Sequence, residues 1–100
     1  MTKVQMHPSI ADEVPWSEHI TPYDETHLVV YLRLLDAFAA DVSRDDMCKI
    51  ILEIDPQTEP RRAQTALDSH MRRAIWMTQE GYVDLLKRGG LTADHLRRRT

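Results

Sequence analysis

The sequence predicts an all-α fold, a small helical domain of four to five helices that includes a helix-turn-helix with an extended turn. Three observations predict this fold. Apolar residues recur with a helical period along most of the span 21–80, and capping residues or prolines stand where the periodic segments begin. The expected third helix also has an arginine-rich outer face after a short connection, which is typical of helix-turn-helix modules.

Size and composition limit the possibilities further. At 100 residues with 42% apolar residues, the chain is long enough for one domain and too apolar for global disorder. The single cysteine, Cys48, excludes an internal disulfide. The N-terminus lacks the apolar core of a signal peptide, and charged residues interrupt the longest apolar segment. We therefore expect a cytoplasmic protein without membrane contact, and a monomer when free.

The net charge of −3 is unevenly distributed along the chain. Residues 1–60 carry twelve acidic and four basic side chains, whereas residues 61–100 carry nine basic and four acidic ones. A DNA-binding domain is usually basic overall, and acidic residues beside a binding face repel phosphate. The charge pattern therefore makes DNA binding unlikely.

Three regions are expected along the chain. Residues 1–20 lack a helical period and contain two prolines, so they are expected to form an extended arm or a disordered tail. The helix-turn-helix-like domain is expected at 21–90, followed by a fraying C-terminal tail at 91–100. The apolar residues that could pin the arm to the domain are Val14, Trp16 and Ile20.

The first helix is expected to begin after Thr21 and to run to about Asp41. Thr21 is a suitable N-cap, Pro22 suits the first helical position, and Asp24 completes a capping-box pattern. The residues expected to face the core are Leu28, Tyr31, Leu32, Leu35, Phe38, Ala39 and Val42. A second apolar strip, formed around Arg33 and Asp36 by Val29, Val30, Ala37 and Ala40, must be covered by the arm, covered by a partner or left bare.

The second helix is expected from Arg44 to Ile54, capped by Ser43. The residues expected in the core are Met47, Ile50, Ile51 and Ile54, with Cys48 and Leu52 on the flank. No histidine stands beside Cys48 in the sequence to activate its thiol, so we expect it to be a small buried apolar residue and not a reactive thiol.

The third helix is expected to begin after Thr58 and to end near Gly81. Its expected core face is Ala63, Leu67, His70, Met71, Ala74 and Ile75, with His70 as a hydrogen-bonded, packed imidazole. Its expected outer face is Arg62, Thr65, Ser69, Arg72, Arg73 and Trp76. The apolar segment 82–86 is expected to add one helical turn packed against the core.

No catalytic or metal site is expected. The five histidines are scattered and none has a partner at zinc-ligand spacing, and the sequence contains no phosphate-binding loop or other catalytic motif. We therefore expect a binding module without a cofactor and without enzymatic activity.

The most informative cluster combines arginines with a tryptophan. It is either a solvated helix face with ion pairs such as Asp68–Arg72, or a contact surface for phosphates or for protein. Tryptophan and arginine are enriched in protein-protein hot spots, although the segment 82–86 could instead cover the tryptophan. The cluster consists of Arg61, Arg62, Arg72, Arg73 and Trp76.

The segment GYVDLL at 81–86 resembles the Gly-Tyr-x-x-Leu-Leu ending of a domain family of unknown function in regulators of integrative and conjugative elements. The order of elements is also similar: a capped helix, a second helix, a lengthened turn and an arginine-bearing third helix. The resemblance covers roughly residues 24–88. It implies an extended-turn helix-turn-helix, found either as the DNA-binding half of activators of element excision and transfer or alone in small QseM-like antiactivators.

A chain of one domain that is acidic around its third helix is more similar to the antiactivators. We therefore expect an antiactivator that mimics the activator's own domain and binds the activator's N-terminal domain. The expected partner-binding residues are Val29, Val30, Arg33, Ala37 and Trp76. The alternative is a small DNA-binding repressor whose DNA-facing residues would be Arg61, Arg62, Thr65, Ser69, Arg72 and Arg73. A structural accessory subunit is a third possibility.

Overall fold

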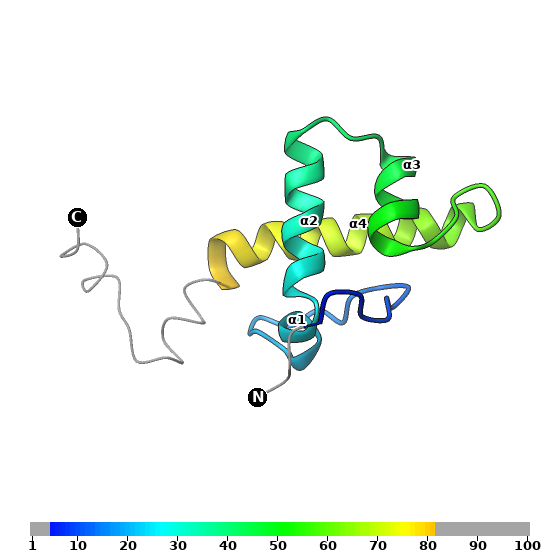
Figure 1. Ribbon diagram of the computed structural model, residues 1–100. Coiled ribbons are helices and arrows are strands. Elements are labelled where there is room, and N and C mark those ends of the chain that lie inside the picture. Colours follow the sequence, from blue (N-terminus) through cyan, green and yellow to red (C-terminus); the bar gives the residue numbers. More distant parts are fainter. Residues whose placement is uncertain (1–4, 82–100) are drawn as a thin grey trace.

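The computed structural model describes residues 5–81, which form a compact all-helical domain (Figure 1). Within these residues there are four α-helices and no strand, and two α-helices continue into short π-helical turns. The elements are α1 (Pro22–Thr26), α2 (Leu28–Ala39), α3 (Arg44–Asp46) with η1 (Met47–Leu52), and α4 (Pro60–Trp76) with η2 (Met77–Gly81). The all-α prediction is confirmed. The predictions for 82–86 and for the tail lie outside the described residues.

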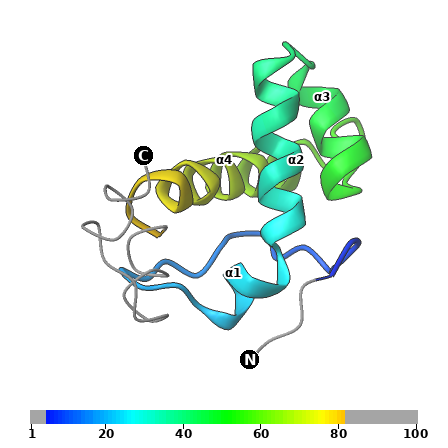
Figure 2. The same ribbon diagram turned by 60° about the vertical axis from the view of Figure 1, so that its left-hand side comes forward.

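The fold is built on a steep crossing of α2 and α4 (Figure 1). α3 and η1 lie beside both helices on one side of the crossing, and α1 and the non-helical segment 5–20 lie on the opposite side (Figures 1 and 2). We call the segment 5–20 the arm. Its residues Val14 and Ile20 are buried, whereas Trp16 is 54% exposed. No helix within 5–81 has the length and apolar character needed to cross a bilayer.

The capping box at Thr21 is confirmed. The Thr21 hydroxyl accepts a hydrogen bond from the backbone N–H of Asp24, and the Asp24 carboxylate accepts one from the N–H of Thr21. The helix is not continuous, however, because His27 leaves helical geometry and separates α1 from α2. α2 ends where Asp41 adopts a left-handed conformation, with φ of 59°. The expected single helix over 21–41 is therefore two helices.

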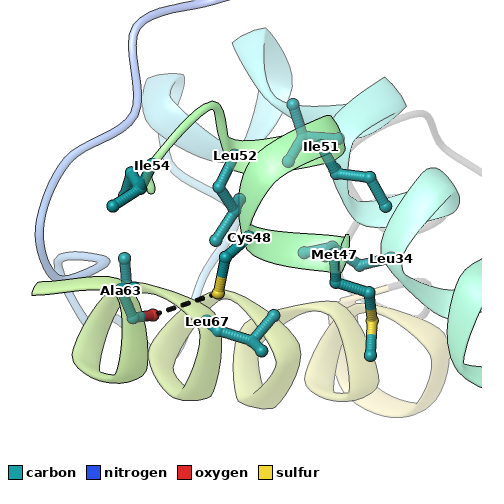
Figure 3. Close-up of a cluster of buried hydrophobic side chains, with 10 residues drawn as sticks. Leu34, Met47, Cys48, Ile51, Leu52, Ile54, Ala63 and Leu67 are labelled. Carbon is teal, nitrogen blue, oxygen red and sulfur yellow. Dashed lines mark hydrogen bonds between the residues drawn. The ribbon is translucent and has the colours of Figure 1, made fainter. Parts of the chain in front are cut away.

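The hydrophobic core lies where α2, η1 and α4 meet (Figure 3). Each large side chain buried there contributes about 1.5–3 kcal/mol relative to an exposed one. Small alanines on α4 allow α2 and η1 to approach it closely. The core residues are Val30 and Leu34 of α2, Met47, Cys48, Ile51 and Leu52 of η1, Ile54, and Ala63, Ala66 and Leu67 of α4.

The expected core face of α2 is largely wrong. Val30, Tyr31 and Leu34 are buried, whereas Leu32 and Phe38 are 61% and 64% exposed. Ala39 and Val42 are also exposed, and Leu28 and Leu35 are half-buried. α2 is apolar around most of its circumference, so its period alone allows two orientations. The contact with the alanines of α4 selects the orientation that buries Val30 and Leu34.

The second helix departs from the prediction because it widens after Asp46. A π-helix has more residues per turn than an α-helix, so the side chains of η1 rotate away from the phase expected for a regular α-helix. Cys48 and Leu52 enter the core and Ile50 turns outward, with 63% of it exposed. Glu53, with φ of 59°, ends the helix, so it stops at Leu52 and not at Ile54.

The third helix begins one residue later than expected. Pro60 is its first residue and Glu59, not Thr58, precedes it, without a side-chain capping bond. The prediction that Ala63, Leu67, His70 and Ala74 face the core is confirmed, whereas Met71 is half-buried and Ile75 is 45% exposed. Ser69 and Arg73, which were expected on the outer face, are buried.

Candidate protein-binding surface

Arg73 is a fully buried structural residue, contrary to the prediction that it faces outward. Its guanidinium donates two hydrogen bonds to Asp24, with Nε–Oδ1 and Nη2–Oδ2 distances of 3.0 and 2.7 Å. It donates two more to the backbone carbonyls of Ser17 and His19 in the arm, at 2.6 and 2.8 Å. Both side chains of the Arg73–Asp24 pair are 0% exposed. The guanidinium thus joins α4, α1 and the arm.

Both oxygens of the Asp24 carboxylate accept hydrogen bonds. Besides Arg73, it accepts hydrogen bonds from the Tyr31 hydroxyl at 2.8 Å and from the Thr21 backbone N–H at 2.9 Å. Burial raises the pKa of Asp24, but the hydrogen bonds from Arg73, Thr21 and Tyr31 outweigh it and leave the pKa below its usual value. Burial, together with the bond to Asp24, raises the pKa of Tyr31. The pair is therefore ionised and Tyr31 is neutral at physiological pH.

Trp76 and Trp16 contact the same arginine. The Arg73 guanidinium carbon lies 3.8 Å from the centre of the Trp76 ring and 4.9 Å from that of Trp16. The two indoles also meet edge to face, with their centres 6.1 Å apart. Trp76 is half-buried, and its ring contacts Arg73 and Trp16 within the domain.

Two other residues of the expected outer face are also held by the arm. Ser69 is buried, and its hydroxyl accepts a hydrogen bond from the Val14 N–H at 3.1 Å. Arg62 forms ion pairs with Asp12 of the arm at 2.6 Å and with Glu59 at 3.1 Å. Of the six residues expected to face DNA, three therefore form hydrogen bonds or ion pairs within the protein: Arg62, Ser69 and Arg73.

The other three remain on the surface of α4. Arg61, Thr65 and Arg72 are exposed and follow one another at intervals that place them on the same helical stripe. Asp68, which lies on that stripe between them, is paired with Arg44 at 2.6 Å. The stripe thus carries one ion pair, Arg44–Asp68, and two arginines, Arg61 and Arg72, that form no ion pair with any residue in 5–81.

An exposed feature with both apolar and charged residues lies between the end of α2 and η1. It is a hollow of about 270 Å³ whose apolar lining includes the exposed residues Val42 and Ile50. We call it the α2–η1 surface. The full lining is Arg33, Asp36, Ala37, Val42, Asp46, Ile50 and Ile51.

Charges surround this apolar lining. Asp36 and Asp46 line the hollow, and Asp41 and Asp45 are exposed in the same stretch of chain. Arg33 also lines it and donates a hydrogen bond to the Ile50 carbonyl at 3.5 Å. Two acidic residues and one basic residue line the hollow, so its potential favours a positively charged ligand.

The five expected partner-binding residues are not brought together. Arg33 and Ala37 line the α2–η1 surface. Val30 is 1% exposed and belongs to the core, so it is not accessible to a partner as was expected. Val29 and Trp76 are half-buried, and Trp76 lies against Arg73.

A second apolar hollow, of about 240 Å³, lies between α2 and the end of α4. Its lining comes from Leu28, Tyr31, Leu32, Leu35, Ala74, Met77 and Thr78. Nearly all of this lining is apolar, so it lacks the mixed charges of the α2–η1 surface.

Two titratable side chains in the interior have structural roles. Cys48 is buried, as expected, and its Sγ lies 3.6 Å from the Ala63 carbonyl (Figure 3). Burial raises the pKa of its thiol. His70, expected as a packed imidazole, is 0% exposed and hydrogen-bonds to the Ala66 carbonyl and the Tyr23 hydroxyl, each at 2.6 Å. Within residues 5–81, no group of three or more possible ligands could hold a metal ion.

Comparison with known proteins finds no matching family model and no matching curated protein. The exposure of Ile50 was not predicted from the sequence because a regular helix places it in the core. The Asp24–Arg73 pair was not predicted because the two residues are 49 positions apart and each fits a local role, one in a cap and the other on a basic face.

Proposed function

We propose that this protein is an antiactivator, which binds a transcriptional activator of the excision and transfer of an integrative and conjugative element and blocks its activity. The proposal combines the resemblance of the sequence to small antiactivators with one observation on the fold. That observation is the α2–η1 surface, where Val42 and Ile50 are exposed beside a hollow. Isolated exposed apolar residues are common, but apolar residues around a concave surface are typical of contact sites.

The chemistry of the α2–η1 surface indicates the kind of segment that it would bind. The apolar lining would take one or two apolar side chains, and Asp36 and Asp46 would attract basic residues beside them. We therefore propose that the activator presents an apolar segment flanked by lysine or arginine, and that this segment belongs to its N-terminal domain. By occupying it, the antiactivator would compete with the activator's own second domain.

The test is to measure binding between the purified protein and the activator encoded beside it. Ile50→Glu should weaken binding at least about tenfold, because it places a charge among the contacts at the centre of the interface. Ile75→Glu is the matched control, since Ile75 is also exposed but lies on α4. It should leave binding unchanged. Both variants should retain the wild-type unfolding curve, because both positions are exposed.

Two results would overturn the proposal. One is a failure of the wild-type protein to bind the activator in a calorimetric titration. The other is an Ile50→Glu protein that binds as tightly as the wild type, which would remove the α2–η1 surface from the interface.

A DNA-binding repressor is the second candidate, and the exposed stripe of Arg61, Thr65 and Arg72 favours it. In that case η1, the connection 53–59 and α4 would act as an extended-turn helix-turn-helix, with α4 in the major groove. The burial of Arg73 and Ser69 leaves fewer side chains for this role. A gel shift on the promoters of the element at low salt distinguishes the two functions. A specific shift that is lost in Arg61→Ala/Arg72→Ala would support the repressor.

A further inference from the structure

The imidazole of His27 faces two carbonyl oxygens. Its Nδ1 lies 2.7 Å from the Tyr23 carbonyl at the end of α1, and its Nε2 lies 2.7 Å from the Ser9 carbonyl in the arm. The side chain is buried, with 4% exposed. A carbonyl oxygen accepts hydrogen bonds and cannot donate them. Both ring nitrogens must therefore carry a proton if both contacts are hydrogen bonds.

We propose that His27 is a pH-dependent latch for the arm: its doubly protonated, positively charged ring holds the Ser9 carbonyl, and loss of one proton releases this part of the arm. In a neutral imidazole one nitrogen has a lone pair in place of its proton. At 2.7 Å that lone pair would face the lone pairs of a carbonyl oxygen, so an attraction becomes a repulsion. Since the bond to Tyr23 is local, the contact with Ser9 is the one that breaks.

Titratable groups of α1, α2 and α4 surround the His27 ring. On α1, the Tyr23 ring stacks on the imidazole with the centres 3.6 Å apart, and burial raises the pKa of Tyr23. Asp24 on the same helix is ionised and is neutralised by Arg73 of α4. On α2, Tyr31 is neutral. From the arm, the group that faces the ring is the Ser9 carbonyl.

From α4, His70 faces the same site, with its ring centre 6.5 Å from that of His27. The Tyr23 hydroxyl accepts a hydrogen bond from the Ala11 N–H at 3.0 Å and can therefore direct its own proton to the Nε2 of His70. His70 is then neutral and donates from Nδ1 to Ala66. Burial lowers the pKa of His70, the bond to Ala66 opposes this, and the nearby charge of His27 lowers it further. The two histidines thus hold different protonation states.

The protonation of His27 sets the direction in which docking of the arm changes with pH. The docked arm binds one more proton than the released arm, so docking is stronger at low pH and weakens as the pH rises. Histidine side chains in general change charge between about pH 5 and 8, and the test therefore covers that range. Ser9 lies next to Ile10, which packs against the hydrophobic core, so release would uncover part of that contact.

The test is nuclear magnetic resonance of the full, isotope-labelled chain between pH 5 and 8. The ring nitrogen signals should report two protons on His27 at the acidic end and one on His70. As His27 loses its proton, the exchange protection of the Ala11 amide, corrected for intrinsic rates, should fall by about tenfold, as expected for a lost hydrogen bond to a charged group. The protection of the Leu67 amide, in the buried part of α4, should not change.

Two variants provide a second, independent test. His27→Gln should remove the pH dependence of Ala11 protection, and His7→Gln, which changes an exposed histidine of the arm, should retain it. If His27→Gln does not fold, the titration of the wild-type protein decides the matter. A singly protonated His27 in the protein with a docked arm, or Ala11 protection that is constant from pH 5 to 8, would overturn the proposal.

Discussion

Replacing Arg73 by methionine distinguishes a buried structural arginine from a ligand-binding one. The substitution keeps an unbranched side chain but removes four hydrogen bonds, two of them to Asp24 and two to carbonyls of the arm. It also leaves the carboxylate of Asp24, which is 0% exposed, without its counter-charge. Removing one partner of a buried ion pair costs about 3–5 kcal/mol. Because a domain of this size has a stability on the order of 5–10 kcal/mol, the variant should lose about half of it.

The measurement is equilibrium unfolding in urea at pH 7, followed by far-ultraviolet circular dichroism. Arg72→Met is the matched control, because Arg72 is the preceding residue on α4 and is exposed. Its stability should lie within about 0.5 kcal/mol of the wild type. In a double-mutant cycle, Asp24→Asn combined with Arg73→Met should cost less than the sum of the single changes, since each single change leaves its partner unpaired. An Arg73→Met protein as stable as Arg72→Met would refute the buried pair.

Three further predictions concern the core and the helix ends. Leu34→Ala should cost about 2–5 kcal/mol in a urea titration, whereas Leu32→Ala, at an exposed position of the same helix, should cost under about 1 kcal/mol; similar losses would contradict the orientation of α2. The thiol of Cys48, buried and with a raised pKa, should react with a disulfide reagent far more slowly in the native protein than in urea; equal rates would place it at the surface. Glu53→Gly should raise stability by about 0.5–1 kcal/mol in thermal unfolding, because glycine adopts the φ of 59° without strain; a loss would indicate an unrecognised role of the glutamate side chain.

The features that the sequence predicted well depend on neighbouring residues. The capping box needs only Thr21 and Asp24, three positions apart, and its geometry is as expected. The burial of Cys48 and His70 was also predicted, because each lies on or beside an apolar helix face. Such features depend on residues that are close together in the sequence, so the sequence alone is enough to predict them.

The features that the sequence predicted poorly depend on distant residues. The orientation of α2 could not be read from its own period, because Leu32 and Leu34 fit two equally apolar faces and the contact with α4 decides between them. The outward turn of Ile50 depends on the π-helical geometry of η1. Arg73 resembled a solvent-facing arginine because its partner Asp24 is remote in sequence. The residues of the candidate surface were therefore only partly predicted.

The anchors of the arm also bear on how the chain is synthesised and folds. Val14 binds Ser69, Ser17 binds Arg73 and Asp12 binds Arg62, so residues 50 to 56 positions apart in the sequence meet in the structure. Contacts of such long range require the closure of a large loop, which costs entropy and slows folding. On the ribosome, the N-terminal part of the chain would leave the exit tunnel before its partners exist. The Asp24 carboxylate therefore remains hydrated until α4 has been made, and the arm can complete the domain only after translation has passed Arg73.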